Sequence, residues 1–176
     1  MKILVDADSC PAGARRVILK AAEKRRIKAV FAANRPIPDI KGDFVVMALC
    51  SPKSGAADDY IVELAEAGDL AITRDVPLAL RLTEKTVAVI DDRGRVFTRD
   101  NIRSYLSIRN FQVDLAMNGV DIVRTANYGK KELKQFADSF DKQLTKAARQ
   151  PASPPAGLKA LRAGVPEAAP TPRFRV

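Results

Sequence analysis

The fold is decided by residues 2–11, KILVDADSCP, whose pattern returns further along the chain. The apolar run before Asp6 is continuous rather than alternating, as in strands that are buried on both faces of a parallel sheet. Asp6 and Asp8 end this strand, and Pro11 suits the first turn of a following helix. The stretch therefore predicts a buried parallel strand, an acidic loop and a helix, in that order.

Apolar runs and helical patterns alternate in the same way up to about residue 100. The predicted strands are residues 2–6, 28–33, 44–49, 69–73, 87–90 and 96–98, and the predicted helices between them are residues 11–26, 56–65 and 76–83. Such alternation implies an α/β fold with a mostly parallel central sheet flanked by helices.

The chain becomes helical after Asp100, with apolar residues at helical spacing over 102–115 and again over 133–144. We expect both segments to cover the sheet and to complete an α/β domain of residues 1–148. Residues 149–176 are rich in Pro, Ala and Arg and have few large apolar residues, so we expect a disordered tail.

Composition excludes several classes of protein. Every apolar run is far shorter than the roughly 20 residues needed to span a bilayer, so we expect a soluble, cytoplasmic protein. The chain has no histidine, which removes Ser-His-Asp and Cys-His catalysis and histidine-ligated zinc. Its two cysteines, Cys10 and Cys50, form no disulfide framework and are expected to be free thiols.

The net charge of +9 suits a polyanionic partner such as nucleic acid, and RNA is the expected one. Residues 149–176 hold five basic residues and one acidic residue, a net +4 that leaves +5 for residues 1–148. The predicted domain is therefore only moderately basic.

Acidic residues follow or open four of the predicted elements. They are Asp6 and Asp8 after the first strand, Asp75 after the fourth, Asp91 and Asp92 after the fifth, and Asp58 and Asp59 in the first turn of a helix. The carboxyl ends of parallel strands share one edge, where ligands bind, so these carboxylates are expected to meet there. Like charges in one crevice favour a hard divalent cation, and all-oxygen ligands suit Mg²⁺ or Mn²⁺.

Each acid also has a purely structural interpretation. Asp8 and Asp75 precede helices and are suited to capping them, and the helix dipole favours Asp58 and Asp59 without any function. Neighbouring helical residues point about 100° apart, so only one of that pair should face the crevice. Asp91 and Asp92 precede Arg93-Gly94, an ordinary turn sequence, and are the weakest candidates for metal ligands.

Candidate phosphate contacts are less distinctive. Lys53 and Ser54 lie before a helix, Arg35 lies in the loop after the second strand, and Arg74 adjoins Asp75. A Walker P-loop is absent. A further series, Arg103, Arg109 and Arg124 with Tyr105 and Tyr128, suits a nucleic-acid backbone, although ordinary solvated charges explain it equally well.

The stretches VDADSCP and ADDYIVELAEAGDLAITRDVPLA, residues 57–79, resemble the YaiI/YqxD family of uncharacterised bacterial proteins, which is related to the PIN-like nuclease fold. The resemblance covers residues 1 to about 146. It implies a metal site whose acids map onto Asp6, onto Asp58 or its neighbour Asp59, and onto Asp75, with Asp8 as an additional local acid. Asp58 is preferred because it precedes Ile61-Val62 by three residues, as the family's helix acid does.

Three functions remain open at this stage. The first is a divalent-metal-dependent nuclease in which Asp6, Asp8, Asp58 and Asp75 are catalytic. The second is a phosphatase, because Val5-Asp6-Ala7-Asp8-Ser9 also resembles the aspartyl-phosphate motif of haloacid dehalogenase-like enzymes. The third is a noncatalytic protein that binds RNA or another partner on the same fold.

Overall fold

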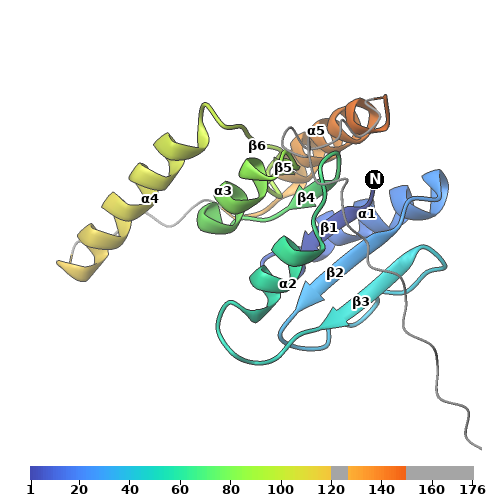
Figure 1. The fold of residues 1–176 in the computed structure, drawn as a ribbon, viewed down its shortest axis with the longest axis horizontal. Helices are drawn as coiled ribbons and strands as arrows, with labels where there is room; N and C mark the ends of the chain where they lie inside the picture. The colour runs from blue at the N-terminus through green and yellow to red at the C-terminus, as the bar shows by residue number, and fades with distance from the viewer. Residues whose placement is uncertain (120–126, 150–176) are drawn as a thin grey trace, which may run out of the picture.

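The computed structural model describes residues 1–119 and 127–149, and these form an α/β fold (Figure 1). The elements in chain order are β1 (Ile3–Asp6), α1 (Ala12–Arg25), β2 (Ala29–Ala33), β3 (Val45–Leu49), α2 (Ala56–Leu64), β4 (Leu70–Ile72), α3 (Val76–Glu84), β5 (Ala88–Ile90), β6 (Val96–Phe97), α4 (Ile102–Met117) and α5 (Lys130–Arg149). The predicted order of strands and helices is confirmed, with boundaries that differ by a few residues.

The six strands form one sheet in the order β3-β2-β1-β4-β5-β6. Strands β1 to β5 are parallel, and only β6 runs antiparallel to its neighbour. The chain builds outward from β1 to β3 and then returns to place β4 against β1, with Val5 opposite Ile72. The direction of winding therefore reverses between β1 and β4, and in open α/β sheets ligands bind in the crevice at such a point.

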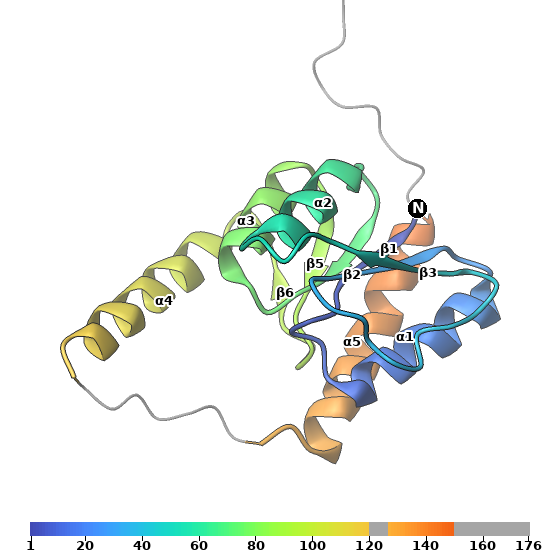
Figure 2. The same cartoon turned by 90° about the horizontal axis from the view of Figure 1, so that it is seen from below.

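Helices cover both faces of the sheet (Figure 2). Side chains alternate along β1, so Ile3 and Val5 pack towards α1 and α5, whereas Leu4 packs towards α2 and α3. All three are at most 1% exposed, as the continuous apolar run requires. This double burial fixes the register of β1 and thereby the place where Asp6 emerges.

The two C-terminal helices behave differently. Phe136, Phe140 and Leu144 of α5 are buried in the core, so the expectation that this segment covers the sheet is confirmed. For α4 it is wrong, because only Ile102 is buried and the helix extends away from the sheet beside α3 (Figure 1). The short edge strand β6 directs the chain outward, and helical periodicity does not reveal which partner an apolar face will find.

Two other expectations concern the C-terminal tail and membrane-spanning segments. The predicted disordered tail lies, apart from Arg149, outside the described residues, as does Arg124. Among the helices that the structure describes, none is long and apolar enough to cross a membrane.

Candidate functional site

An open hollow of about 440 Å³ lies at the carboxyl edge of the sheet where β1 adjoins β4. Three carboxylates that are far apart in the sequence line it: Asp6 at the end of β1, Asp58 in the first turn of α2, and Asp75 at the start of α3. Asp8, Ser9 and Arg74 complete its lining. We call this place the acidic hollow.

Asp6 is held by two hydroxyl groups. Ser9 Oγ and Thr73 Oγ1 both donate to Asp6 Oδ2, over 2.7 and 2.9 Å. Within the described residues, the other carboxylate oxygen, Oδ1, has no hydrogen-bond partner in the protein. Asp6 is 7% exposed, so its carboxylate is fixed in orientation and keeps one oxygen for a ligand.

Asp75 has both a structural and a potential functional role. Its Oδ1 accepts from the backbone N–H of Leu78 over 2.7 Å, which confirms the helix-capping interpretation. Its backbone N–H donates to Thr73 Oγ1 over 2.9 Å, so Thr73 connects Asp75 to Asp6. The second oxygen of Asp75 remains for the hollow, because a cap uses only one.

The pKa of Asp58 shows the electrostatic effect of placing these acids around one hollow. Burial, reinforced by the negative charges of Asp6 and Asp75, raises its pKa from 3.8 to about 6. Arg81 opposes this shift without cancelling it. The acidic hollow therefore has more negative charge than the surrounding protein neutralises, and either a proton or a cation relieves the excess.

Asp8 lines the hollow but is largely committed elsewhere. Its Oδ2 accepts from the backbone N–H of Asn34 over 2.8 Å, and Arg35 Nε lies 3.3 Å from its Oδ1. Asp8 thus ties the loop after β2 to the loop after β1. The helix-capping interpretation is wrong for Asp8, since α1 begins after Pro11 without a side-chain cap.

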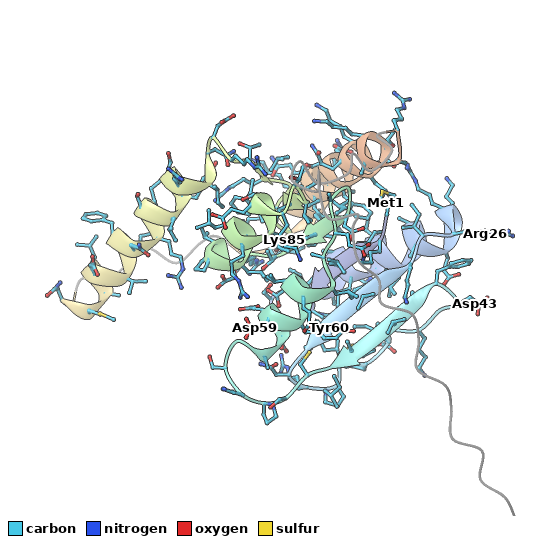
Figure 3. All side chains as sticks on the ribbon, in the orientation of Figure 1. Met1, Arg26, Asp43, Asp59, Tyr60 and Lys85 are labelled. Atoms are coloured by element: carbon cyan, nitrogen blue, oxygen red, sulfur yellow. The ribbon has the colours of Figure 1, made fainter. Side chains whose placement is uncertain are left out.

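Other predicted site residues lie away from the hollow. Asp59 is exposed on α2 and pairs with Arg81 over 2.8 Å, so Asp58 is the member of that pair that lines the hollow, as helical geometry required (Figure 3). Lys53 and Ser54 are exposed on the loop before α2 and are not part of its lining.

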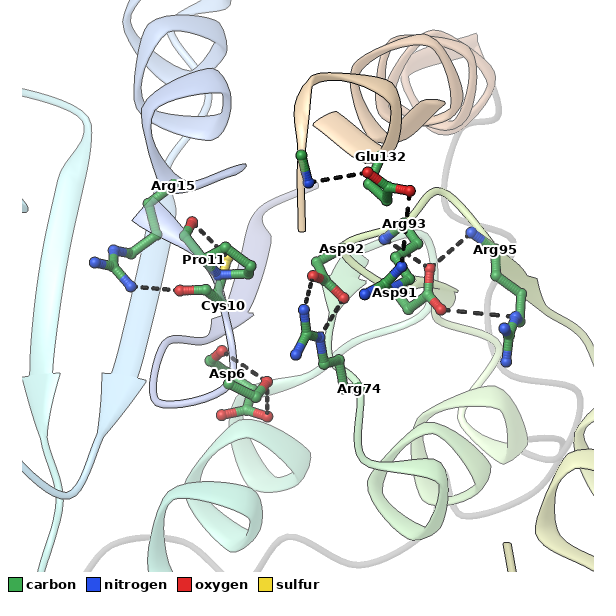
Figure 4. Close-up of polar contacts among 12 residues, drawn as sticks. Asp6, Cys10, Pro11, Arg15, Arg74, Asp91, Asp92, Arg93, Arg95 and Glu132 are labelled. Atoms are coloured by element: carbon green, nitrogen blue, oxygen red, sulfur yellow. Dashed lines mark hydrogen bonds and ion pairs between the residues drawn. The ribbon is translucent and has the colours of Figure 1, made fainter. Parts of the chain in front are cut away.

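Asp91 and Asp92 follow β5 but do not join the acidic hollow. Asp91 accepts from the backbone N–H groups of Arg93 and Arg95, as expected for a turn residue. Asp92 holds Arg74 through both carboxylate oxygens, and this pairing raises the pKa of the Arg74 guanidinium (Figure 4). The expectation that all strand-end acids gather in one crevice is therefore wrong for this pair, because each acid satisfies its own arginine or turn.

Within residues 1–119 and 127–149, no three or more carboxylate or thiol side chains are grouped into a cage that could hold a metal ion. Mg²⁺ does not need such a cage, because it retains several waters and is usually held by one or two carboxylates. The donor set of the hollow fits that description, since Asp6 and Asp75 each offer a carboxylate oxygen that the protein leaves unused. Cys10 is a buried free thiol whose pKa burial raises to about 12, and it is unsuited to metal binding.

Thr73 and Ser9 are the residues whose role the sequence did not reveal. Both orient Asp6, and Thr73 also fixes the backbone at Asp75. Their spacing offered a weak signal, because Ser9 follows Asp6 by three residues and Thr73 precedes Asp75 by two, as in hydroxyl-stabilised turns. The same spacings occur widely in loops of no special function.

Comparison with known proteins gives a family. A model described as "Uncharacterized BCR, YaiI/YqxD family" matches residues 4–146. A UPF0178 protein of Treponema denticola is 49% identical over 85% of this chain and 96% of its own length. Another, from Syntrophobacter fumaroxidans, is 44% identical over 83% of this chain and 95% of its own length. No solved structure matches the chain. The chain belongs to the YaiI/YqxD family of uncharacterised proteins.

Proposed function

We propose that this protein is a divalent-metal-dependent nuclease that hydrolyses phosphodiester bonds in RNA, built on a PIN-like α/β domain and using Mg²⁺ or Mn²⁺. The observation that carries the proposal is the acidic hollow, which Asp6, Asp58 and Asp75 from three separate elements line at the point where the sheet reverses its winding. The elevated pKa of Asp58 supports it, because uncompensated negative charge is what a cation would neutralise.

The residues divide into ligands and supports. Asp6 and Asp75 present their unused oxygens to the ion, and Asp58, once ionised, adds a third charge. Ser9 and Thr73 hold Asp6 in place, and the α3 cap holds Asp75. A bound Mg²⁺ or Mn²⁺ ion would supply an activated water and stabilise the leaving oxygen of the phosphodiester.

The haloacid dehalogenase-like alternative is less well supported. In that chemistry the first aspartate attacks phosphorus and the second donates a proton. Here the second acid, Asp8, accepts a backbone hydrogen bond from Asn34 at Oδ2 and pairs with Arg35 at Oδ1, so both of its carboxylate oxygens already face donors of the protein. The phosphatase interpretation also leaves Asp58 and Asp75 without a role.

The test measures cleavage of a fluorescent single-stranded RNA with Mn²⁺ or Mg²⁺, in wild type, Asp6→Asn and Asp75→Asn. Asparagine can accept the same hydroxyl bonds at position 6 and is an equally good cap at position 75, so both variants should fold. We expect each to lose at least about 100-fold of the activity, while Asp59→Asn, beside the hollow and exposed, stays near wild type. Undiminished cleavage by both variants would exclude the proposal.

Metal binding has its own readout. Mn²⁺ at 100 times its dissociation constant should stabilise the folded protein by about 2.7 kcal/mol in a thermal melt. We expect this gain to disappear in Asp6→Asn and to persist in Asp59→Asn. RNA binding without turnover in any divalent metal would instead favour the noncatalytic alternative.

A further inference from the structure

A second hollow, of about 530 Å³, lies between the β5–β6 turn and α4. Its lining includes Arg74, Arg93, Arg95, Arg109, Tyr105 and Gln112. We call it the arginine hollow. Two carboxylates, Asp91 and Asp92, also line it, so four cations face two anions there and the hollow has an excess of positive charge.

Two buried carboxylates and the partly exposed Glu132 pair with three of its arginines. Asp92, 1% exposed, holds Arg74 at Nε and Nη2, and Asp91, 6% exposed, lies 3.7 Å from Arg95 Nε. Arg93 lies 4.0 Å from Glu132 of α5 (Figure 4). The Arg74 and Arg95 side chains remain 43% and 48% exposed. Each thus keeps N–H groups that its carboxylate does not use, presented from a fixed position to a ligand.

The two hollows share Arg74, which lines both. Arg74 directly precedes Asp75 in the chain, so its backbone lies beside the acidic hollow. Its guanidinium group is held by Asp92. A phosphate at the acids would therefore have a guanidinium group at its side, and the next phosphates of the same strand would meet further arginines.

We propose that the arginine hollow holds the single RNA strand on one side of the phosphodiester that lies at the acidic hollow. This inference rests on the proposed nuclease function and adds the path that the bound strand follows beyond the acidic hollow. Arg74, which lines both hollows, contacts the backbone between them, and Arg109 contacts it on the α4 side. Because both arginines are proposed to contact the backbone and not the edges of the bases, the site should recognise the charge and shape of the strand and not its sequence.

Arg95 contributes a stacking surface. Its guanidinium lies over the ring of Tyr105, 4.9 Å from the centroid, and Tyr105 is itself fixed edge-on against Phe97. Arg95 lines the hollow and is 48% exposed, so part of the guanidinium that Tyr105 and Asp91 hold stays accessible there. Bases stack on arginine planes as they do on aromatic rings, and they do so without regard to sequence.

The first experiment measures binding of a fluorescein-labelled 12-nucleotide single-stranded RNA by anisotropy in EDTA, where no cleavage occurs. Arg109→Ala removes one phosphate contact, so affinity should fall about fivefold at 0.1 M salt and the salt slope should fall by about 0.7. The sequence grouped Arg103 with Arg109, but the structure puts Arg103 at an exposed position of the same helix outside the hollow. Arg103→Ala removes the same charge there and is therefore the matched control. Equal effects of the two variants, or no effect of either, would overturn the proposal.

The second experiment tests the stacking surface. Arg95→Lys keeps the charge and loses the plane, so it should weaken binding of the RNA at least about fivefold. A strand of the same length without bases has nothing to stack, and its affinity should be the same for wild type and Arg95→Lys. Equal losses with both strands would show that Arg95 does not stack on a base.

These results are separable from those of the nuclease test. If Asp6→Asn retains cleavage but Arg109→Ala loses affinity selectively, the arginine hollow binds RNA and the assignment of the acidic hollow fails. If cleavage depends on Asp6 while Arg109→Ala and Arg103→Ala bind alike, the nuclease stands and the strand takes another path.

Discussion

The hydroxyl of Thr73 donates a hydrogen bond of 2.9 Å to Asp6 Oδ2, which joins residues that are 67 positions apart in the chain. The Thr73 Oγ1 atom also accepts a hydrogen bond from the backbone N–H of Asp75. Thr73 is 2% exposed, so water cannot replace either bond without rearrangement. One buried hydroxyl therefore sets the relative position of two carboxylates in the acidic hollow.

Thr73→Val should test this arrangement, because valine has the same shape and lacks the hydroxyl. The backbone N–H of Asp75 loses its acceptor, and we expect a loss of about 1–3 kcal/mol in the free energy of unfolding, measured with urea. Mn²⁺ affinity should fall as well, since Asp6 loses one of its two donors. Thr73→Ser should restore both properties. A valine variant that binds Mn²⁺ like wild type would show that Thr73 is structural only.

Asp58 predicts a pH dependence of stability. Its pKa is raised on folding from 3.8 to about 6, so the folded state holds the proton more tightly than the unfolded state. The resulting penalty is absent below about pH 4, grows as the pH rises to about 6 and is constant above that. Asp58→Asn should therefore raise the melting temperature by roughly 1–3 °C at pH 7.5 and leave it unchanged at pH 4.

The matched control for this prediction is Asp59→Asn. It removes the same charge one residue away, where the side chain is exposed and paired with Arg81, so little change is expected at either pH. Mn²⁺ binding to wild type should also weaken below about pH 6, where Asp58 holds a proton that the ion must displace. A pH-independent effect of Asp58→Asn would contradict this account.

Breaking the ion pair between Arg74 and Asp92 should lower the free energy of unfolding. Asp92→Asn keeps the shape but offers only one acceptor to a guanidinium that uses two. We expect a loss of about 1–3 kcal/mol in urea unfolding, limited because Arg74 is partly exposed and regains water. Asp100→Asn, an exposed position with the same change of charge, should lie within about 0.5 kcal/mol of wild type.

Gly94 should not tolerate a side chain. Its φ is +84°, and a Cβ atom would lie 2.5 Å from the backbone oxygen of Gln135 in α5. Gly55 has a similar φ of +81° with open space around it, so Gly55→Ala measures the backbone cost alone, about 1–2 kcal/mol. Gly94→Ala should cost at least about 1 kcal/mol more in thermal or urea unfolding, because α5 must move. Equal costs for both variants would show that α5 yields freely.

The sequence predicted the sheet well because its signals are local. Continuous apolar runs require burial on both faces, and such strands alternate with helices only in a mostly parallel sheet. Asp6 and Asp75 became candidates for the same reason, since each lies at the carboxyl end of a predicted strand. The family resemblance located Asp58, and helical geometry limited the choice between it and Asp59.

Long-range contacts account for what the sequence could not show. Asp8 and Asp92 have the same local context as Asp6, yet Asn34, Arg35 and Arg74 engage them through contacts that depend on strand order. Helix α4 has the periodicity of a covering helix, but it begins at the sheet edge beyond β6 and finds no sheet beneath it.

The sequence by itself determined the strands, the helices and the acids at the strand ends, because each depends on the pattern of neighbouring residues. The tertiary structure alone decided which carboxylate oxygens remain unused, which arginines are held by buried acids, and that the acidic and arginine hollows share Arg74. A carboxylate is equally suited to a cap, an ion pair or a metal, and only the groups that folding brings to it determine which of these it becomes.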